Sequence, residues 1–317
     1  MRVNILPARS STTALIAHGG AGSWRPGTDD EATAGMRAAV AAGREILGRG
    51  GSALDAVCAT VVALEDNPIF NAGTGACLNI DDFCELDACV MESTDDRAGA
   101  VSALQRVKNP ILVARRVMEE TDHVMLAGEG ALRFARVMGF GDHDPVTPAR
   151  RKDWLEKRDS IGNAPGKRSL KNRAFLATHP EYSGGTVGAT AVDANGVLAA
   201  ATSTGGVTLK MVGRVGDTPI PGAGNYASSH VAASATGTGE FVMRTLATRA
   251  ISEAVERGAT LAQAVRAILD RMGRQFDADV GVIAVDRNGV TVAQHRTPAM
   301  PHAYFEGNGE IVSRMRA

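Results

Sequence analysis

The chain has 317 residues, of which 44% are hydrophobic and 22% are charged, an ordinary globular composition. A net charge of −1 gives no long-range field for nucleic acid or an anionic membrane. No apolar run approaches the roughly 18 residues that span a bilayer, and the N-terminus lacks the apolar core of a secretory signal. We therefore expect a cytoplasmic protein. Its cysteines lack Cys-x-x-Cys spacing, which favours buried thiols over a zinc site: Cys58, Cys77, Cys84 and Cys89.

Strands and helices are predicted in the first half of the sequence in the order strand, helix, helix, hairpin, helix, helix. Their expected ranges are 13–17, 30–48, 52–65, 75–91, 110–119 and 127–138. Ser52 and Asp55 form a capping-box-like start for the second helix. The first strand runs into a glycine-rich turn at 18–22.

Periodic patterning then stops at about residue 144 and resumes only at about 186. Between 150 and 173 there are nine Lys or Arg and three acidic residues, and the longer stretch contains four prolines. A structureless stretch of this length inside a compact domain needs a reason. The composition predicts a basic, flexible linker at about 144–185. A nucleic-acid-binding arm is the alternative, and the scarcity of interleaved aromatic residues counts against it.

Regular patterning in the second half predicts two hairpins separated by two helices. The expected ranges are 186–193 paired with 197–204, then 240–257, 260–272 and 280–294. The strings Ala-Val-Asp-Ala-Asn-Gly-Val and Ala-Val-Asp-Arg-Asn-Gly-Val nearly repeat, which indicates two similar hairpins. Strands and helices come in blocks, so layered sheets with outer helices fit better than a doubly wound parallel sheet.

A Gly-Gly-Thr sequence leads directly into the apolar strand that begins at residue 186. A break between Gly185 and Thr186 would give Thr186 a free α-amine beside its own hydroxyl. An α-amine, with a pKa near ~7.7–8.0, is a suitable base at neutral pH. The hairpin would bring Thr204 back beside Thr186. Taken alone, the motif is also consistent with a loop that enters a strand.

Two further segments carry residues suited to substrate binding. Arg214 and Asp217 lie three positions apart in a glycine-flanked turn, where they could clamp the carboxylate and ammonium of a free amino acid. A surface ion pair is the alternative. The sequence Thr-Gly-Thr-Gly-Glu at 236–240 leads into a helix, where exposed backbone N–H groups can stabilise an oxyanion.

Seven segments together, in order along the chain, resemble the isoaspartyl peptidase/L-asparaginase family, the plant-type asparaginases of the N-terminal-nucleophile hydrolase superfamily. They are 18–22, 71–75, 85–91, 185–189, 202–206, 213–217 and 236–240. The resemblance covers about 13–305 apart from the linker. It implies an α+β fold, a four-layer αββα sandwich. It also implies self-cleavage into an α subunit (1–185, ending in the linker) and a β subunit (186–317). These would form one domain, assembled as a dimer of αβ units.

The activity implied by the resemblance is hydrolysis of β-aspartyl dipeptides and L-asparagine, small-molecule substrates, with no catalytic cofactor and no nucleic-acid or membrane partner. By motif match, Thr186 would be the nucleophile and, through its freed amine, the base. Thr204 would orient it. The Thr236 hydroxyl and the Gly237 N–H would form the oxyanion hole.

The same match assigns the substrate contacts. Arg214 would hold the α-carboxylate, and Asp217, helped by the Gly239 carbonyl, would hold the α-amine. Two residues depart from the family pattern: Leu209 stands where a polar residue is frequent, and Thr190 where a small apolar one is usual. Both departures leave the substrate preference open.

A loop after the second predicted helix resembles the family's sodium-binding loop, which coordinates through backbone carbonyls. The match implies a structural sodium held by Leu64, Glu65, Asn67, Phe70, Ala72 and Thr74. A turn rigidified by Pro68 and Gly73 is the alternative interpretation.

Three other functions compete with this one. A glycosylasparaginase would share the fold, but its oxyanion turn usually reads Thr-Gly-Asn-Gly-Asp. A nucleotide-binding protein would need Gly-x-Gly-x-x-Gly, and neither 73–75 nor 237–239 completes it, because Leu78 and Val242 occupy the last glycine position. A processing-defective homologue could act only as a binding module.

Overall fold

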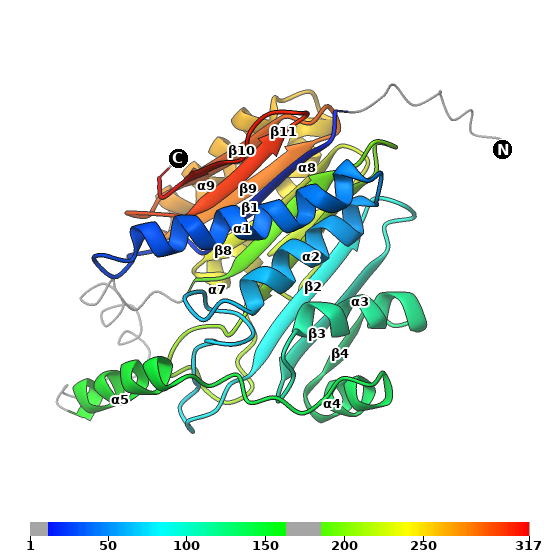
Figure 1. The fold of residues 1–317 in the computed structure, drawn as a ribbon. Coiled ribbons are helices and arrows are strands. Elements are labelled where there is room, and N and C mark those ends of the chain that lie inside the picture. The colour runs from blue at the N-terminus through cyan, green and yellow to red at the C-terminus, as the bar shows by residue number, and fades with distance from the viewer. Residues whose placement is uncertain (1–11, 163–184, 317) are drawn as a thin grey trace.

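A computed structural model describes residues 12–162 and 185–316; the remainder of the expected linker, residues 163–184, lies outside the described residues. The described chain is a mixed α/β structure with two β-sheets (Figure 1). The larger sheet has eight strands in the spatial order β12-β11-β1-β5-β6-β2-β3-β4. The smaller sheet has four strands in the order β10-β9-β8-β7.

The strands of the larger sheet are β1 (Ala14–His18), β2 (Leu86–Glu92), β3 (Ala98–Leu104), β4 (Met125–Ala127), β5 (Val187–Val192), β6 (Leu198–Thr204), β11 (His302–Glu306) and β12 (Val312–Arg314). Those of the smaller sheet are β7 (Asn225–Ala227), β8 (Val231–Gly237), β9 (Val280–Asp286) and β10 (Thr291–His295). The helices are α1 (Asp29–Gly48), α2 (Ala53–Glu65), α3 (Pro110–Glu120), α4 (Gly128–Val137), α5 (Pro148–Gly162), α7 (Gly239–Thr245), α8 (Ala247–Glu256) and α9 (Leu261–Phe276). Within the two described ranges, none of these helices is long and apolar enough to cross a membrane.

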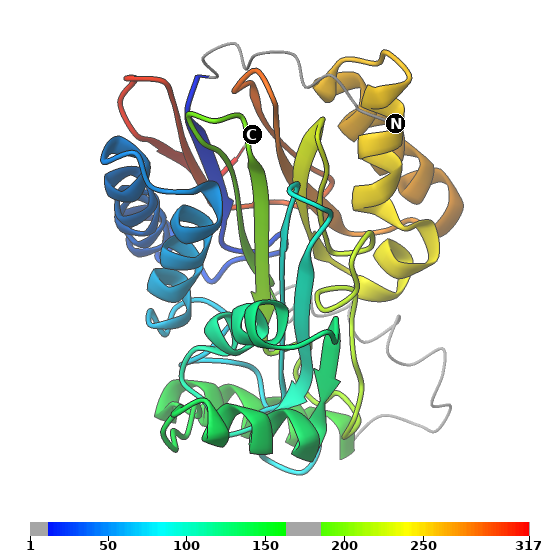
Figure 2. The same cartoon turned by 90° about the vertical axis from the view of Figure 1, so that its right-hand side faces the viewer.

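The two sheets pack face to face, and helices cover the outer face of each (Figure 2). Helices α1, α2 and α3 lie on the larger sheet, and α8 and α9 lie on the smaller one. Three clusters of buried side chains fill the spaces between these layers. Leu15 and Val57 belong to the cluster under α1–α3, Ile16 and Ile283 to the one between the sheets, and Val282 to the one under α8 and α9. The region between the sheets is therefore mainly an apolar core, and polar groups also project into it.

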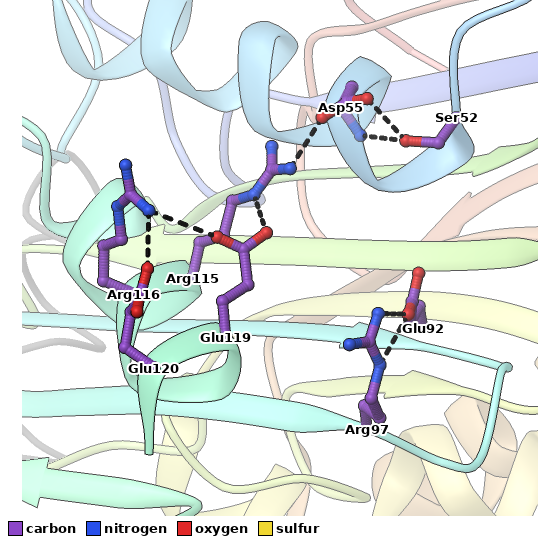
Figure 3. A network of polar contacts seen from close by, with 8 residues as sticks. All are labelled: Ser52, Asp55, Glu92, Arg97, Arg115, Arg116, Glu119 and Glu120. Carbon is purple, nitrogen blue, oxygen red and sulfur yellow. Dashed lines mark hydrogen bonds and ion pairs between the residues drawn. The ribbon is translucent and has the colours of Figure 1, made fainter.

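Local sequence explains how α2 is placed (Figure 3). Ser52 caps the helix, because its Oγ accepts the Asp55 N–H at 3.0 Å. Arg115 of α3 forms ion pairs with Asp55 at 2.7 Å and with Glu119 at 2.7 Å, and so ties α3 to the start of α2. Burial raises the pKa of Asp55, but the hydrogen bonds from Ser52 and Arg115 outweigh it and leave that pKa below its ordinary value.

The hairpin at 186–204 is confirmed, since β5 and β6 pair antiparallel with Val187 opposite Ser203. The hairpin expected at 75–91 is wrong, because β2 pairs with β3 and β6 instead. Asn79 closes a tight turn by accepting the N–H groups of Asp81 and Phe83, so the chain reverses without forming a second strand.

The stretch expected to lack regular structure begins with helix α5, so that expectation is wrong for residues 148–162. Thr147 starts the helix by accepting the Arg150 N–H at 3.2 Å, and Pro148 stands at the first helical position. Among the α5 side chains that the structure describes, Trp154 is the only buried hydrophobic one, with 5% of its surface exposed. A single anchor gives no apolar period, and the sequence pattern therefore missed the helix.

The helix expected at 240–257 is interrupted. It is two helices, α7 and α8, separated by Leu246, whose φ of 47° is left-handed. A left-handed residue cannot continue an α-helix, so the chain changes direction there.

Candidate active site

The start of β5 places Thr186 in the middle of the larger sheet, between β1 and β6. Only 5% of its surface is exposed. Its Oγ1 donates to Thr204 Oγ1 at 3.3 Å, and its N–H donates to Thr236 Oγ1 at 3.3 Å. Thr204 is the last residue of β6 and lies opposite Thr186, where the hairpin was expected to bring it. The structure therefore brings both threonines to the residue predicted to be the nucleophile.

The hydrogen bonds to these two hydroxyl groups limit where each can direct its proton. Thr204 Oγ1 also accepts the Gly206 N–H at 2.9 Å. Thr236 Oγ1 accepts the N–H groups of both Ala21, at 3.1 Å, and Thr186. Because Thr236 Oγ1 accepts two hydrogen bonds, its own proton is free to be donated to a third group. That is the property required of an oxyanion-hole donor.

Two glycines bring backbone unusually close to this point. Gly20 has a φ of +115°, and an added Cβ would lie 2.5 Å from Gly185 Cα and 3.3 Å from Thr186 N. The turn after β1 thus lies directly against the Gly185–Thr186 peptide. Gly237 has a φ of +119°, and a Cβ there would lie 2.2 Å from the Asp279 carbonyl oxygen. Only glycine fits at either position, so the turn at Gly20 is held against Thr186 and the turn at Gly237 against Asp279.

A buried polar chain lies between the two sheets beneath Thr186. His18 Nε2 and Ser234 Oγ are 2.8 Å apart, and Ser234 Oγ and Thr202 Oγ1 are also 2.8 Å apart. Asn225 Nδ2 donates to Thr202 Oγ1 at 2.9 Å. Burial lowers the pKa of His18 to about 3, so its ring is neutral at physiological pH. Sequence reasoning missed Ser234 and Asn225, although a single serine in an alanine-rich strand is a detectable signal.

Arg214 and Asp217 converge on one side of the site around Gly239. A Cβ on Gly239 would lie 2.6 Å from Asp217 Oδ1 and 3.3 Å from Arg214 Nη2. Glu240, which sequence reasoning did not single out, accepts from Arg214 Nε at 3.0 Å and Nη2 at 2.9 Å. The guanidinium is therefore held toward the start of α7, in front of the space that Gly239 leaves open.

Asp217 is almost completely buried, and burial raises its pKa to about 7. Its Oδ2 has no hydrogen-bond partner among the residues that the structure describes. A buried carboxylate with an unused acceptor is suited to an ammonium group, because a cation would both neutralise it and complete its hydrogen bonds.

Glu85, which directly precedes β2, fixes the loop that carries Arg214. Glu85 Oε1 accepts the Gly213 N–H at 2.9 Å, and Lys210 Nζ donates to the Glu85 carbonyl at 2.8 Å. Burial lowers the pKa of Lys210 and raises the pKa of Asp87. The attraction between the two opposite charges partly offsets both shifts. The loop is thus held at Lys210 and at Gly213.

The loop with the expected sodium ligands folds back on itself at the end of α2. The Thr74 N–H donates to the Glu65 carbonyl at 2.8 Å, the Phe70 N–H to the Asn67 carbonyl at 3.1 Å and the Asn67 N–H to the Leu64 carbonyl at 3.3 Å. The Ala72 side chain is buried beside them. The Leu64 carbonyl also accepts the Asp66 N–H, whereas the Glu65 and Asn67 carbonyls each keep a second lone pair that could bind a hard cation. In the described ranges no group of three His, Cys, Asp or Glu side chains could hold a metal.

The side chain of Glu65 connects this loop to the strand that ends in Thr204. Glu65 Oε1 accepts from Ser203 Oγ at 2.7 Å and from the Ile111 N–H at 3.0 Å. Burial raises the pKa of Glu65 to about 8. The sequence alone gave no reason to expect this contact, because it joins three segments distant along the chain.

All four cysteines lie in the described ranges as buried, free thiols, as predicted. Burial raises the pKa of Cys58, Cys84 and Cys89 to about 12. These three thiols are consequently unreactive at neutral pH.

Comparison with known proteins agrees with this geometry. The family model described as asparaginase matches residues 11–312. A plant-type L-asparaginase of Pyrococcus abyssi is 45% identical, over 94% of this chain and 98% of the relative. An isoaspartyl peptidase/L-asparaginase of Rattus norvegicus is 41% identical, over 95% and 88%, and one of Danio rerio is 41% identical, over 91% of each. The chain belongs to the asparaginase family that contains these plant-type L-asparaginases and isoaspartyl peptidases.

Proposed function

We propose that this protein hydrolyses β-aspartyl dipeptides and L-asparagine to release aspartate, with Thr186 as nucleophile. The observation that carries the proposal is the convergence of Thr204 Oγ1 and Thr236 Oγ1 on Thr186, beside the tightly packed Gly185–Thr186 peptide. The names of relatives over 40% identical along nearly the whole chain support the substrate class.

The same geometry supports self-processing. Before cleavage, Thr186 Oγ1 would attack the Gly185 carbonyl, the C–N bond would break and leave the Thr186 amine free, and Gly185 would be held as an ester on Oγ1. Water would then hydrolyse this ester to give two chains, 1–185 and 186–317. Close approach of Gly20 to Gly185 restricts the backbone at this point, and such restriction favours attack from one direction. We propose that the two chains stay together as one αββα sandwich of the N-terminal-nucleophile type. We also propose that two αβ units assemble into a dimer and that the protein is located in the cytoplasm.

Catalysis would then proceed through a covalent aspartyl enzyme. The free amine of Thr186 takes the proton from Oγ1 as that oxygen attacks the substrate β-carbonyl. The amine then gives this proton to the leaving amine or ammonia as the amide bond breaks. Water, deprotonated by the same amine, attacks the resulting ester and releases aspartate. The Thr236 hydroxyl and the Gly237 N–H stabilise the oxyanion in both steps, and Thr204 orients Oγ1.

The substrate is anchored by groups that it does not react with. Arg214 is proposed to bind the α-carboxylate, because a guanidinium matches both carboxylate oxygens. Asp217 Oδ2 and the Gly239 carbonyl are proposed to bind the α-amine. For the loop at 64–74, we propose a structural sodium held by carbonyl oxygens of Leu64, Glu65, Asn67, Phe70, Ala72 and Thr74. The ion would support the turn and take no part in the reaction.

The experiment that tests the function combines two measurements on the purified protein. N-terminal sequencing should find a chain that begins at Thr186, and β-aspartyl dipeptides should yield free aspartate. Release of aspartate from glycosylated asparagine but not from β-aspartyl dipeptides would instead favour a glycosylasparaginase. A single full-length chain without activity would favour a binding homologue.

A further inference from the structure

Helix α5 packs on the turn that supports the active-site loop, although its sequence suggested a linker. The side chain of Trp154 lies in a cluster with Leu78 and Leu86, and its indole N–H donates to the Asn79 carbonyl at 2.7 Å. At the start of the helix, Arg150 donates to the Gly75 carbonyl at 2.6 Å. These contacts hold α5 against residues 75–86, on the side of the molecule seen at the bottom of Figure 1.

One residue of α5 reaches past this turn to the loop that joins Thr204 to Arg214. Lys157 is buried, with 6% of its surface exposed, and its Nζ donates to Thr208 Oγ1 at 2.8 Å. A buried ammonium requires hydrogen-bond acceptors, because leaving it unpaired away from water is costly. Burial of a lysine at this position therefore indicates a specific contact, whereas solvated linker lysines would remain exposed.

The Thr208 hydroxyl connects Lys157 to the segment that contains Cys77. Thr208 Oγ1 donates to Cys77 Sγ at 3.2 Å, and the Cys77 N–H donates to Asn71 Oδ1 at 2.7 Å. Asn71 Nδ2 donates in turn to the Gly206 carbonyl at 2.7 Å. The stretch from Gly206 to Thr208 is thus held at both ends, by Asn71 at one and by Lys157 at the other.

We propose that α5 is a positioning arm for the loop at 205–214, and that Lys157 and Thr208 are positioning residues for the substrate clamp. The inference rests on the proposed function, since it concerns how Arg214 is presented to the substrate. It gives a role to helix α5, which lies in the segment that the sequence suggested was only a linker. Thr186 is hydrogen-bonded to Thr204 and Thr236, and the Lys157 ammonium donates to Thr208 and to neither of these hydroxyl groups, so we expect self-cleavage to continue when the Lys157 contact is removed.

The test is a double-mutant cycle on the full chain with Lys157→Met, which keeps most of the stem, and Thr208→Val, which keeps the shape. Each single variant should raise KM for a β-aspartyl dipeptide by about 3- to 10-fold, because one charge-assisted hydrogen bond is lost. kcat should stay within about 2-fold, since the clamp residues do not react. The double variant should be no worse than the more affected single variant, because both remove the same contact.

Lys152→Met is the matched control, because Lys152 is on the same helix with a side chain that is 78% exposed. It should leave KM unchanged, and all variants should self-cleave like wild type. Additive effects in the double variant, or a fall in kcat with KM unchanged, would overturn the inference. If Lys157→Met fails to fold, an unchanged KM in Thr208→Val overturns it alone and a raised KM supports it. A wild type that does not hydrolyse the dipeptide refutes the proposed function instead.

Discussion

Replacing Arg214 by lysine tests the substrate clamp most directly. In the structure the Arg214 guanidinium uses two nitrogens, Nε and Nη2, to reach one oxygen of Glu240, at 3.0 and 2.9 Å. Its side chain is only 17% exposed, so the substrate carboxylate would bind a partly desolvated cation. Arg214→Lys keeps the positive charge but loses the planar pair of donors that spans two carboxylate oxygens.

The expected loss follows from one missing hydrogen bond to a charged group. Such a bond contributes about 1–3 kcal/mol, which corresponds to about 5- to 150-fold in kcat/KM for a β-aspartyl dipeptide. The loss should be in KM, because the α-carboxylate lies away from the scissile amide. Self-cleavage presents no free α-carboxylate and should continue. The pattern of two chains on a denaturing gel should therefore match that of wild type.

The assay compares β-aspartyl dipeptides with analogues whose aspartyl α-carboxylate is blocked. Wild type should reject the blocked form strongly, and Arg214→Lys should discriminate less. Arg249→Lys is the control, because Arg249 also pairs with a glutamate, Glu253, at 3.1 Å, but on the exposed surface of α8. Equal hydrolysis of both substrates by wild type would refute the reasoning and make Arg214–Glu240 a structural ion pair.

Four more outcomes are expected. Thr186→Ala should run as one full-length chain on a denaturing gel and should release no aspartate from β-aspartyl dipeptides. If that variant still gave the fragments 1–185 and 186–317, another protease would be responsible for the cut. Burial lowers the pKa of His18 from 6.5 to about 3, so the unfolded chain binds more protons; the free energy of unfolding should fall by up to about 1.4 kcal/mol per pH unit as pH drops from 6.5 toward 3. His18→Gln should flatten this slope in urea titrations without shifting the pH limb of kcat/KM. Burial raises the pKa of Glu65 from 4.5 to about 8, so between these values the folded state binds more protons than the unfolded chain. The free energy of unfolding should therefore fall as pH rises through this interval, and Glu65→Gln should show a smaller fall in Tm there. Gly188→Ala should lower stability by about 1–3 kcal/mol, because the new Cβ would lie 2.1 Å from a buried serine Oγ, whereas Gly130→Ala, in open space on α4, should raise it by about 0.4–1 kcal/mol.

Local signals in the sequence were enough to predict the elements that carry Thr186 and Thr204. A two-strand hairpin around Asn195-Gly196 fixes its own register, so the pairing of β5 with β6 follows from adjacent residues. The closeness of Arg214 and Asp217 likewise follows from a turn of a few residues. What could be predicted is therefore what a short segment determines by itself.

Contacts between distant segments could not be predicted in this way. The chain from His18 through Ser234 to Thr202 joins β1, β8 and β6, and it exists only because the two sheets pack face to face. Glu240 pairs with Arg214 across 26 positions, and Lys157 reaches Thr208 across 51. Such contacts depend on how sheets and helices are stacked, which no local period encodes.

The two departures from the family pattern are better explained by packing than by substrate preference. Thr190 is fully buried in β5, four residues beyond Thr186 and hence about 13 Å further along the strand, too far to contact a substrate held there. Leu209 has a left-handed φ of 61°, a conformation that asparagine adopts more readily than leucine, and its side chain packs with Leu78 and Trp154 under α5. A polar residue such as asparagine at 209 would lower the cost of the left-handed backbone but would pack less well in this apolar cluster. Leucine therefore strengthens the packing of α5 at some cost in backbone conformation. Met211, three residues before Arg214, is 74% exposed, so we expect substitutions there to change substrate preference more than substitutions at Thr190.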